Sequence, residues 1–195
     1  MFVVVGLGNP GVKYDGTRHN VGFEAADHLV QRYGLTPFKP WKSSHLSRGT
    51  ISGEDILVIK PQTFMNLSGD AVGAAVRYYR CEPANVLVIH DELDFEPGEM
   101  RLKSGGGHGG HNGLRSIMDH IGRDFTRIRV GIGKPPRGLG ENYVLSRFDR
   151  TSRTLIDEVL EDIMDAVESI VTKGVRGAMN TVNGRPSSAK QGDSR

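Results

Sequence analysis

The chain has 195 residues, of which 37% are hydrophobic and 25% are charged, and its formal net charge is +2. This balance excludes an intrinsically disordered chain and a membrane protein, and the length suits one domain with a buried core. The apolar start of the chain, residues 2–5, is too short for a secretory signal or a membrane helix. Because the single cysteine, Cys81, has no internal disulfide partner, we expect a cytoplasmic protein.

Short apolar runs alternate along the chain with segments whose apolar residues repeat at helical spacing. Strands are predicted at residues 2–5, 46–51, 55–59, 86–89, 99–104 and 127–132. Helices are predicted at residues 21–33, 68–80, 112–121 and 155–171. The alternation predicts an α/β fold: a single domain with a mixed, largely parallel twisted sheet flanked by helices on both faces. We expect the folded domain to span residues 1–182 and a flexible polar tail to span residues 183–195.

The segment Gly6-Leu7-Gly8-Asn9-Pro10-Gly11 matches the pattern G-x-G-x-x-G, which in dinucleotide-binding proteins follows a strand. That motif requires a helix that begins within the glycines and an acid at the end of the next strand. Here Pro10-Gly11 favours a turn, and the acid at the nominal distance, Asp27, lies in a predicted helix. We therefore expect no nucleotide cofactor, and a tight loop that presents Asn9 at a cleft.

Charge is unevenly distributed along the chain. Residues 101–137 carry eight Lys and Arg against two acids, Asp119 and Asp124, whereas residues 155–168 carry six acids and no Lys or Arg. Segregation of this kind gives one face a positive field that attracts a polyanion. Taken alone, the basic segment is equally well explained as a solvated surface.

Four segments carry groups that can act on a carbonyl, and each of them follows or overlaps the end of a predicted strand. They are residues 8–20, 61–69, 89–94 and 103–113. Hydrolysis of an ester needs a base near neutral pH, which His19 offers, and a carboxylate such as Asp91 to orient that base. It also needs donors for the developing oxyanion, which asparagine amides supply. Each residue also has an ordinary explanation, since a histidine is usually a surface or core group and Asp91, Asn66 or Asn112 could cap a helix or turn.

The segments together resemble the bacterial-type peptidyl-tRNA hydrolase family. The motifs that carry the resemblance are GLGNPG, TRHN, FMNLSG, HDELD, GGGHGGHNG and RIRVGIG, in family order and spacing over residues 3–133. The combination of HDELD with GGGHGGHNG is far more specific than any single motif. The resemblance implies a hydrolase that cuts the ester bond between a peptide and tRNA, without a metal or other cofactor.

The resemblance also implies roles for individual residues. His19 would be the general base, Asp91 would orient it, and Asn9 would favour an N-blocked aminoacyl group. The substrate-binding residues would be Tyr14, Phe64, Met65, Asn66, His111 and Asn112. Lys103 and Arg129 would bind a tRNA phosphate, which contributes affinity without reading bases. We expect a monomer, because the sequence has no obvious apolar patch.

Two other functions fit parts of the same sequence. A metallohydrolase could use His90, Asp91, His108 and His111, although no H-E-x-x-H pattern or cysteine pair supports it. A non-catalytic RNA-binding relative could keep the fold without the activity, although such a protein has no need for His19 and Asp91 together. The pattern G-x-S-x-G is absent, so a serine nucleophile is not predicted.

Overall fold

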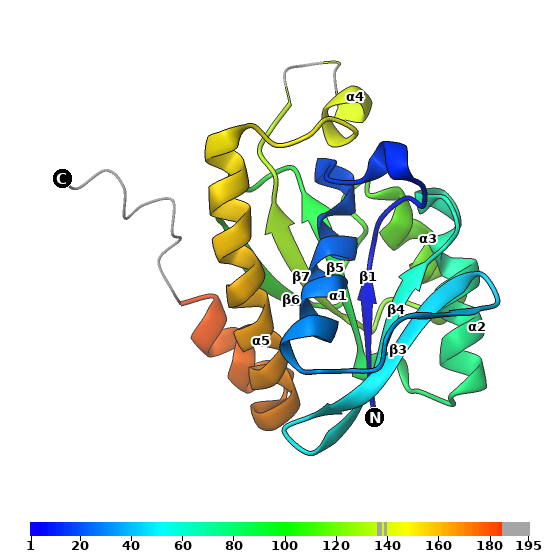
Figure 1. The fold of residues 1–195 in the computed structure, drawn as a ribbon. Helices are drawn as coiled ribbons and strands as arrows, with labels where there is room; N and C mark the ends of the chain where they lie inside the picture. The colour runs from blue at the N-terminus through cyan, green and yellow to red at the C-terminus, as the bar shows by residue number, and fades with distance from the viewer. Residues whose placement is uncertain (136–137, 139, 185–195) are drawn as a thin grey trace.

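The computed structural model describes residues 1–135, 138 and 140–184. Its centre is a seven-stranded sheet in the order β2-β3-β4-β1-β5-β7-β6 (Figure 1). The strands are β1 (Phe2–Gly6), β2 (Lys39–Trp41), β3 (Ser44–Ile51), β4 (Glu54–Pro61), β5 (Val86–Glu92), β6 (Met100–Ser104) and β7 (Thr126–Gly131). The four central strands, β4, β1, β5 and β7, run parallel, and the strands outside them pair antiparallel. The predicted fold class is confirmed.

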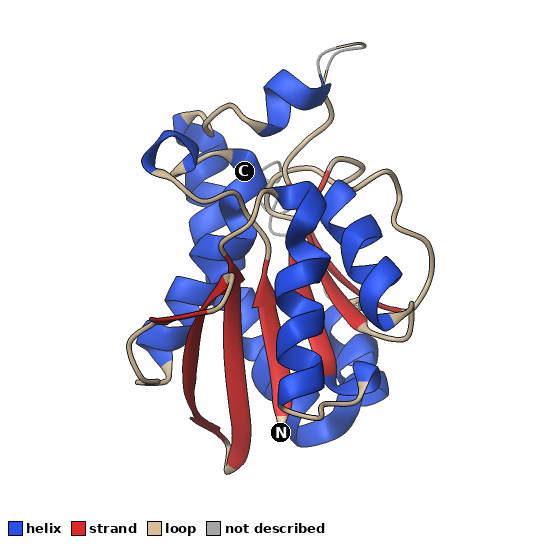
Figure 2. Cartoon of the chain, turned by 90° about the vertical axis from the view of Figure 1, so that its right-hand side faces the viewer, coloured by secondary structure: helices blue, strands red, loops and turns tan. Residues whose placement is uncertain are grey.

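Helices cover both faces of the sheet (Figures 1 and 2). They are α1 (Val21–Arg32), α2 (Ser68–Tyr78), α3 (Asn112–Ile121), α4 (Gly140–Val144) and α5 (Arg150–Val182). One apolar core lies between the sheet and α1 and α5, and a second lies between the sheet and α2 and α3. The first six residues of β5, Val86 to Asp91, are all buried, as a strand covered on both faces requires.

The first strand and the first helix approach each other very closely. A Cβ atom on Gly6 would lie 2.1 Å from the carbonyl oxygen of Gly22, so only glycine allows this contact. The glycine loop after β1 leads into a 3₁₀ helix, Val12–Tyr14, and not into an α-helix. The loop therefore differs from the dinucleotide-binding motif, as the turn residues predict. A second 3₁₀ helix, Arg18–Asn20, directly precedes α1 and carries His19 at the end of the sheet where β1 and β5 finish.

Several elements differ from the predicted ones. Strand β5 continues beyond residue 89 to Glu92, because β7 pairs with it as far as Gly131. Helix α5 extends well beyond residues 155–171 in both directions, and it contains a kink at Gly174, where φ is 73°. The short strand β2 was not predicted.

The residue that follows α5, Asn183, is hydrogen-bonded to the edge of the sheet. The side-chain amide of Asn183 accepts a hydrogen bond from the Leu102 N–H at 2.8 Å and donates one to the Leu102 carbonyl at 3.0 Å. It thereby covers part of the exposed edge of β6, which would otherwise leave these backbone groups unpaired. Residue 183 therefore belongs to the fold. Residues 185–195 of the predicted tail lie outside the described residues.

Candidate active site

A cleft of about 860 Å³ opens at the carboxyl ends of the central strands, the position where open α/β sheets bind ligands. Its walls come from the loop after β1, the turn before α2, the end of β5, the start of α3 and helix α4. Nine of the residues singled out from the sequence line it: Asn9, Tyr14, His19, Phe64, Met65, Asn66, Asp91, His111 and Asn112. The structure therefore brings together residues from four separate segments of the chain.

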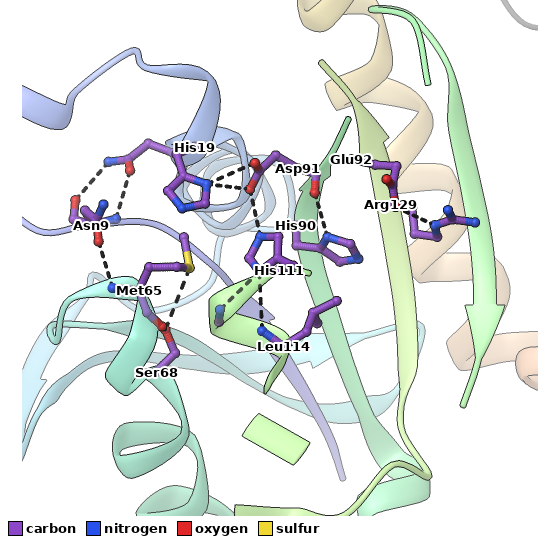
Figure 3. Close-up of polar contacts among 12 residues, drawn as sticks. Asn9, His19, Met65, Ser68, His90, Asp91, Glu92, His111, Leu114 and Arg129 are labelled. Atoms are coloured by element: carbon purple, nitrogen blue, oxygen red, sulfur yellow. Dashed lines mark hydrogen bonds and ion pairs between the residues drawn. The ribbon is translucent and has the colours of Figure 1, made fainter. Parts of the chain in front are cut away.

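His19 and Asp91 form a direct pair (Figure 3). The Nδ1 atom of His19 lies 2.9 Å from both carboxylate oxygens of Asp91. Asp91 is buried at the end of β5, while the side chain of His19 keeps 15% of its surface exposed. Because a carboxylate only accepts hydrogen bonds, Nδ1 of His19 carries a proton and Nε2 is the unprotonated nitrogen when the ring is neutral. Nε2 is thus a base at the wall of the cleft.

His111 contacts the same carboxylate from the other side. Its Nε2 lies 2.9 Å from Asp91 Oδ1, and its Nδ1 accepts hydrogen bonds from the backbone N–H groups of Gly113 and Leu114 at 3.1 and 3.3 Å. The ring therefore caps the N-terminus of α3. Since Nδ1 must accept, the ring proton lies on Nε2 and is donated to Asp91. The prediction for His111 was substrate binding; its ring lines the cleft, but its hydrogen bonds are to the protein.

Burial and neighbouring charges shift the pKa values of His19 and Asp91. Burial lowers the pKa of His19, but the charge of Asp91 and the hydrogen bond to it outweigh burial, so the pKa is raised above 6.5. Burial alone would raise the pKa of Asp91, but the attraction of the two imidazoles and their hydrogen bonds hold it well below its ordinary value. Asp91 is therefore an anion at every working pH, and His19 gains affinity for a proton.

Asn9 is fixed by three hydrogen bonds that leave one donor free. Its side-chain Oδ1 accepts from the Met65 N–H at 2.8 Å. Its backbone N–H donates to Asn20 Oδ1 at 2.8 Å, and its carbonyl accepts from Asn20 Nδ2 at 2.9 Å. Within the described residues the Nδ2 group of Asn9 has no partner, and Asn9 lines the cleft. The arrangement presents an oriented amide donor to a substrate.

The other cleft residues are more exposed. Phe64 is 57% exposed, and Asn66 and Asn112 are exposed as well, whereas Met65 is buried beneath them. No hydrogen bond to another described residue occupies the side chain of either asparagine. Both amides are therefore free to bind a ligand, and Phe64 offers an apolar surface.

Lys103 and Arg129 lie outside the residues that line the cleft. They sit on the adjacent antiparallel strands β6 and β7, and the register Arg101↔Arg129 and Lys103↔Arg127 makes them diagonal neighbours on one face. Arg129 Nε donates to Glu92 Oε2 at 2.9 Å, and Glu92 lines the cleft. The cationic pair is thus connected to the rim of the cleft through one acid.

Three residues near the cleft had no role in the reaction predicted from the sequence. Asn20 frames Asn9, and Arg18 attaches the segment that contains α4 to the loop that carries His19. His90 donates from Nδ1 to the carbonyl of Asp91 at 2.8 Å, and burial lowers its pKa to about 3, so it stays neutral. The TRHN and HDELD motifs contain all three, but the motifs do not reveal which neighbour of His19 or Asp91 supports it.

Comparisons with known proteins agree with this geometry. A family model described as peptidyl-tRNA hydrolase matches residues 3–191. The chain belongs to this family. A protein named peptidyl-tRNA hydrolase from Rhodospirillum centenum is 51% identical over 168 residues, which cover 86% of this chain and 72% of that protein. One of the same name from Rhizobium etli is 44% identical over 183 residues, which cover 93% of this chain and 75% of the relative.

A solved structure leads to the same family. The crystal structure of peptidyl-tRNA hydrolase from Acinetobacter baumannii has a TM-score of 0.90 and 41% sequence identity, and the match covers 94% of this chain and 95% of that one. The chain is therefore a hydrolase, and hydrolysis of peptidyl-tRNA is the function of its family. Among the helices that the structure describes, none has the length and apolar character needed to cross a membrane.

Proposed function

We propose that the protein hydrolyses the ester bond between a peptide and tRNA with His19 as general base, Asp91 as its orienting partner and no metal ion. The observation that carries the proposal is the pairing of His19 Nδ1 with Asp91, which leaves the basic nitrogen Nε2 for the cleft. A general base held in one tautomer by a carboxylate is the usual arrangement for activating water or a hydroxyl group.

The reaction follows from these positions. His19 Nε2 takes a proton from water as the water oxygen attacks the carbonyl carbon of the ester, and a tetrahedral oxyanion forms. The bond from that carbon to the ribose oxygen of the tRNA then breaks, and the proton on His19 passes to the departing oxygen. The buried Asp91 carboxylate stabilises His19 while the imidazole is protonated. General-base catalysis of this kind contributes about 10²–10⁴ in rate.

The amide groups around His19 supply the hydrogen bonds that the substrate needs. The free Nδ2 of Asn9 is available to a carbonyl of an N-blocked aminoacyl group, and its orientation is fixed by the Met65 N–H. Asn66 and Asn112 are available to the tRNA 3′ end, the attacking water or the oxyanion. Tyr14, Phe64 and Met65 offer a largely apolar path that suits peptides of many sequences. We propose that Lys103 and Arg129 bind the 5′ phosphate of the tRNA.

The protonation of His111 supports a reaction without a metal ion. His19, Asp91 and His111 have ligand atoms within 4.8 Å of one another, which is close enough to hold a cation. However, the two backbone N–H groups at Nδ1 of His111 require the ring proton to be on Nε2, the nitrogen that faces Asp91. A metal ion at this position would have to displace that proton and leave an imidazolate.

The test is hydrolysis of an N-acetylated aminoacyl-tRNA with a chelator present. We expect the wild type to cleave it and His19→Ala to be slower by about two orders of magnitude or more, because the general base is lost. His28→Ala is the matched control, since His28 pairs with Glu161 on α5 and lies outside the cleft. Loss of wild-type activity on chelation would contradict the metal-free mechanism. Tight tRNA binding without any cleavage would identify a non-catalytic relative.

We further propose that the protein acts in the cytoplasm as a monomer. The large exposed apolar side chains among the described residues are spread over several elements: Met1, Val12, Phe64, Leu67, Tyr78 and Leu145. Three of them, Phe64, Leu67 and Leu145, lie on or next to the proposed substrate cleft, where exposure serves binding.

A further inference from the structure

A group of aromatic and basic side chains lies on the surface away from the cleft. It consists of Trp41, Lys42, Arg48, Tyr78 and Tyr79, and we refer to it as the Trp41 patch. Its residues come from the end of β2, the following turn, the middle of β3 and the end of α2. In sequence these segments are up to 38 residues apart, and none of them carries a residue assigned to the reaction above.

The three aromatic rings of the Trp41 patch are in mutual contact. The ring centroids of Trp41 lie 5.3 Å from Tyr78 and 5.9 Å from Tyr79, and the two tyrosine rings meet edge to face at 4.9 Å. Trp41 and Tyr79 are half-buried against the second core, but Tyr78 is 63% exposed. An aromatic ring that is mostly exposed to water adds little to the stability of the fold. Stability alone therefore does not explain why Tyr78 is at this position.

Two basic side chains, Lys42 and Arg48, lie over these rings. Lys42 Nζ lies 4.7 Å from the Trp41 ring centroid, and the guanidinium of Arg48 lies 4.4 Å from that of Tyr79. Neither cation, nor the neighbouring Arg80, has an ion pair with any acid in the described part of the chain. Lys42 and Arg80 also have positive φ angles, 47° and 51°, a conformation that favours glycine. The chain thus keeps two basic side chains at turns where glycine would be less strained.

We propose that the Trp41 patch binds unpaired nucleotides of RNA, with a base stacked on the exposed aromatic surface and phosphates at Lys42 and Arg48. Stacking platforms combined with unpaired cations are the means by which proteins hold single strands without reading their sequence. The site is separate from the predicted phosphate pair. Strand β2 and strand β6, which carries Lys103, are the two outer strands of the sheet, and six strand spacings of about 4.8 Å put them roughly 29 Å apart.

The test uses the only tryptophan of the chain, Trp41, as a local reporter. Its fluorescence is titrated with a single-stranded oligoadenylate of about ten nucleotides. The protein carries Lys103→Ala, to weaken binding at the predicted phosphate pair. We expect saturable quenching, because a base stacked on the patch changes the environment of the indole. We expect Tyr78→Ala to weaken the apparent affinity by about tenfold, and Lys42→Ala to weaken it less and to reduce its salt dependence.

The matched control is Lys173→Ala, which removes an exposed lysine from α5 and should leave the titration unchanged. The absence of quenching, or equal affinities for Tyr78→Ala and Lys173→Ala, would overturn the proposal. Poly-glutamate is titrated in parallel, and quenching by it as strong as that by RNA would point to an acidic peptide and also overturn the proposal. Because Tyr78 is 63% exposed, Tyr78→Ala should unfold at the same temperature as its Lys103→Ala parent, and thermal unfolding verifies its fold.

Discussion

His19 and Arg18 are neighbours in the chain, yet they connect to different parts of the cleft wall. His19 pairs with Asp91 at the end of β5, and Asp91 is held in turn by His111 at the start of α3. Arg18 points the other way, and its Nη1 donates to Ser146 Oγ at 2.8 Å and to the carbonyl of Arg147. The residues that it holds follow α4, which lines another part of the cleft wall.

The two sides are built by different means. On the His19 side, the groups that fix the geometry belong to a sheet strand and to the backbone at a helix N-terminus. On the other side, the buried guanidinium of Arg18 makes most of the connections, since it also lies 4.5 Å from the ring centroid of Tyr143 and 5.0 Å from that of Phe148. We infer that changes on the first side alter the chemical step, and changes on the second side alter substrate binding and stability.

The largest effect is expected for Asp91→Asn. His111 must still donate from Nε2, because its Nδ1 accepts two backbone hydrogen bonds. The new amide oxygen would then accept from His111, and its NH₂ group would face Nδ1 of His19. That contact favours the His19 tautomer with its proton on Nε2, which cannot act as the base. We expect kcat to fall by about 10³–10⁴ with KM nearly unchanged, as measured in steady-state hydrolysis of an N-blocked aminoacyl-tRNA.

The pH dependence of the same variant provides a second measurement. His19 acts as a base only when neutral, and Asp91 raises its pKa above 6.5, so wild-type kcat/KM should fall as pH drops through that raised value. Without the carboxylate charge, burial lowers the pKa, and the residual activity should persist to lower pH. Asp94→Asn removes a charge from the same rim and should keep both kcat and the pH profile. If kcat/KM of Asp91→Asn fell at the same low pH as that of the wild type, the orienting role of Asp91 would be contradicted.

The second effect in size is expected for Arg18→Met, which keeps apolar bulk but removes the hydrogen bonds and the charge. Buried hydrogen bonds from a charged group contribute about 1.5–3 kcal/mol, so the free energy of unfolding should fall by about 2 kcal/mol. With α4 less firmly attached, KM should rise several-fold. The fall of kcat/KM at low pH should be unchanged, because the His19–Asp91 pair is intact. Denaturant unfolding and steady-state kinetics measure the two effects.

Lys60→Met is the matched control for Arg18→Met. Lys60 is also largely buried, pairs with Asp27 at 2.6 Å and lies over the rings of Phe23 and Phe38, but it does not line the cleft. Lys60→Met should lower the free energy of unfolding without a change in KM. If both variants raised KM equally, the Arg18 contacts would have no special role in the wall.

The sequence predicted the chemistry of the first side better than that of the second. Strand and helix patterns brought the ends of β1 and β5 and the start of α3 to one edge, so His19, Asp91 and His111 could be expected to lie close together. The ring of His111 was assigned to the substrate because a histidine in a glycine loop gives no sign that it will cap α3. That role depends on its tertiary position beside Asp91, which lies 20 residues earlier.

The part of the wall that Arg18 and α4 form could not be predicted for a physical reason. Arg18 contacts residues about 130 positions later in the chain, through hydrogen bonds to a serine and a backbone carbonyl that no local pattern specifies. Helix α4 has five residues and follows a segment rich in glycine and proline. It is too short for an apolar repeat to be visible. The same limit applies to β2 and to the Trp41 patch, since its rings meet only when β2, β3 and α2 are assembled.

The smallest effect is expected for Lys103→Ala, at the edge of the sheet beyond the His19 side. If Lys103 binds a tRNA phosphate, its loss should raise KM by a few-fold and reduce the slope of log affinity against log salt by about one, with kcat nearly kept. Arg176→Ala, an exposed change on α5, should leave both quantities unchanged. Arg129 is paired with Glu92 at the rim, whereas Lys103 has no ion pair with an acid among the described residues. Lys103 is therefore the better test of the phosphate contact. A fall in kcat at constant KM would instead place Lys103 in the chemical step. That result would contradict the view that the edge strand β6 binds RNA while the His19 site alone cleaves it.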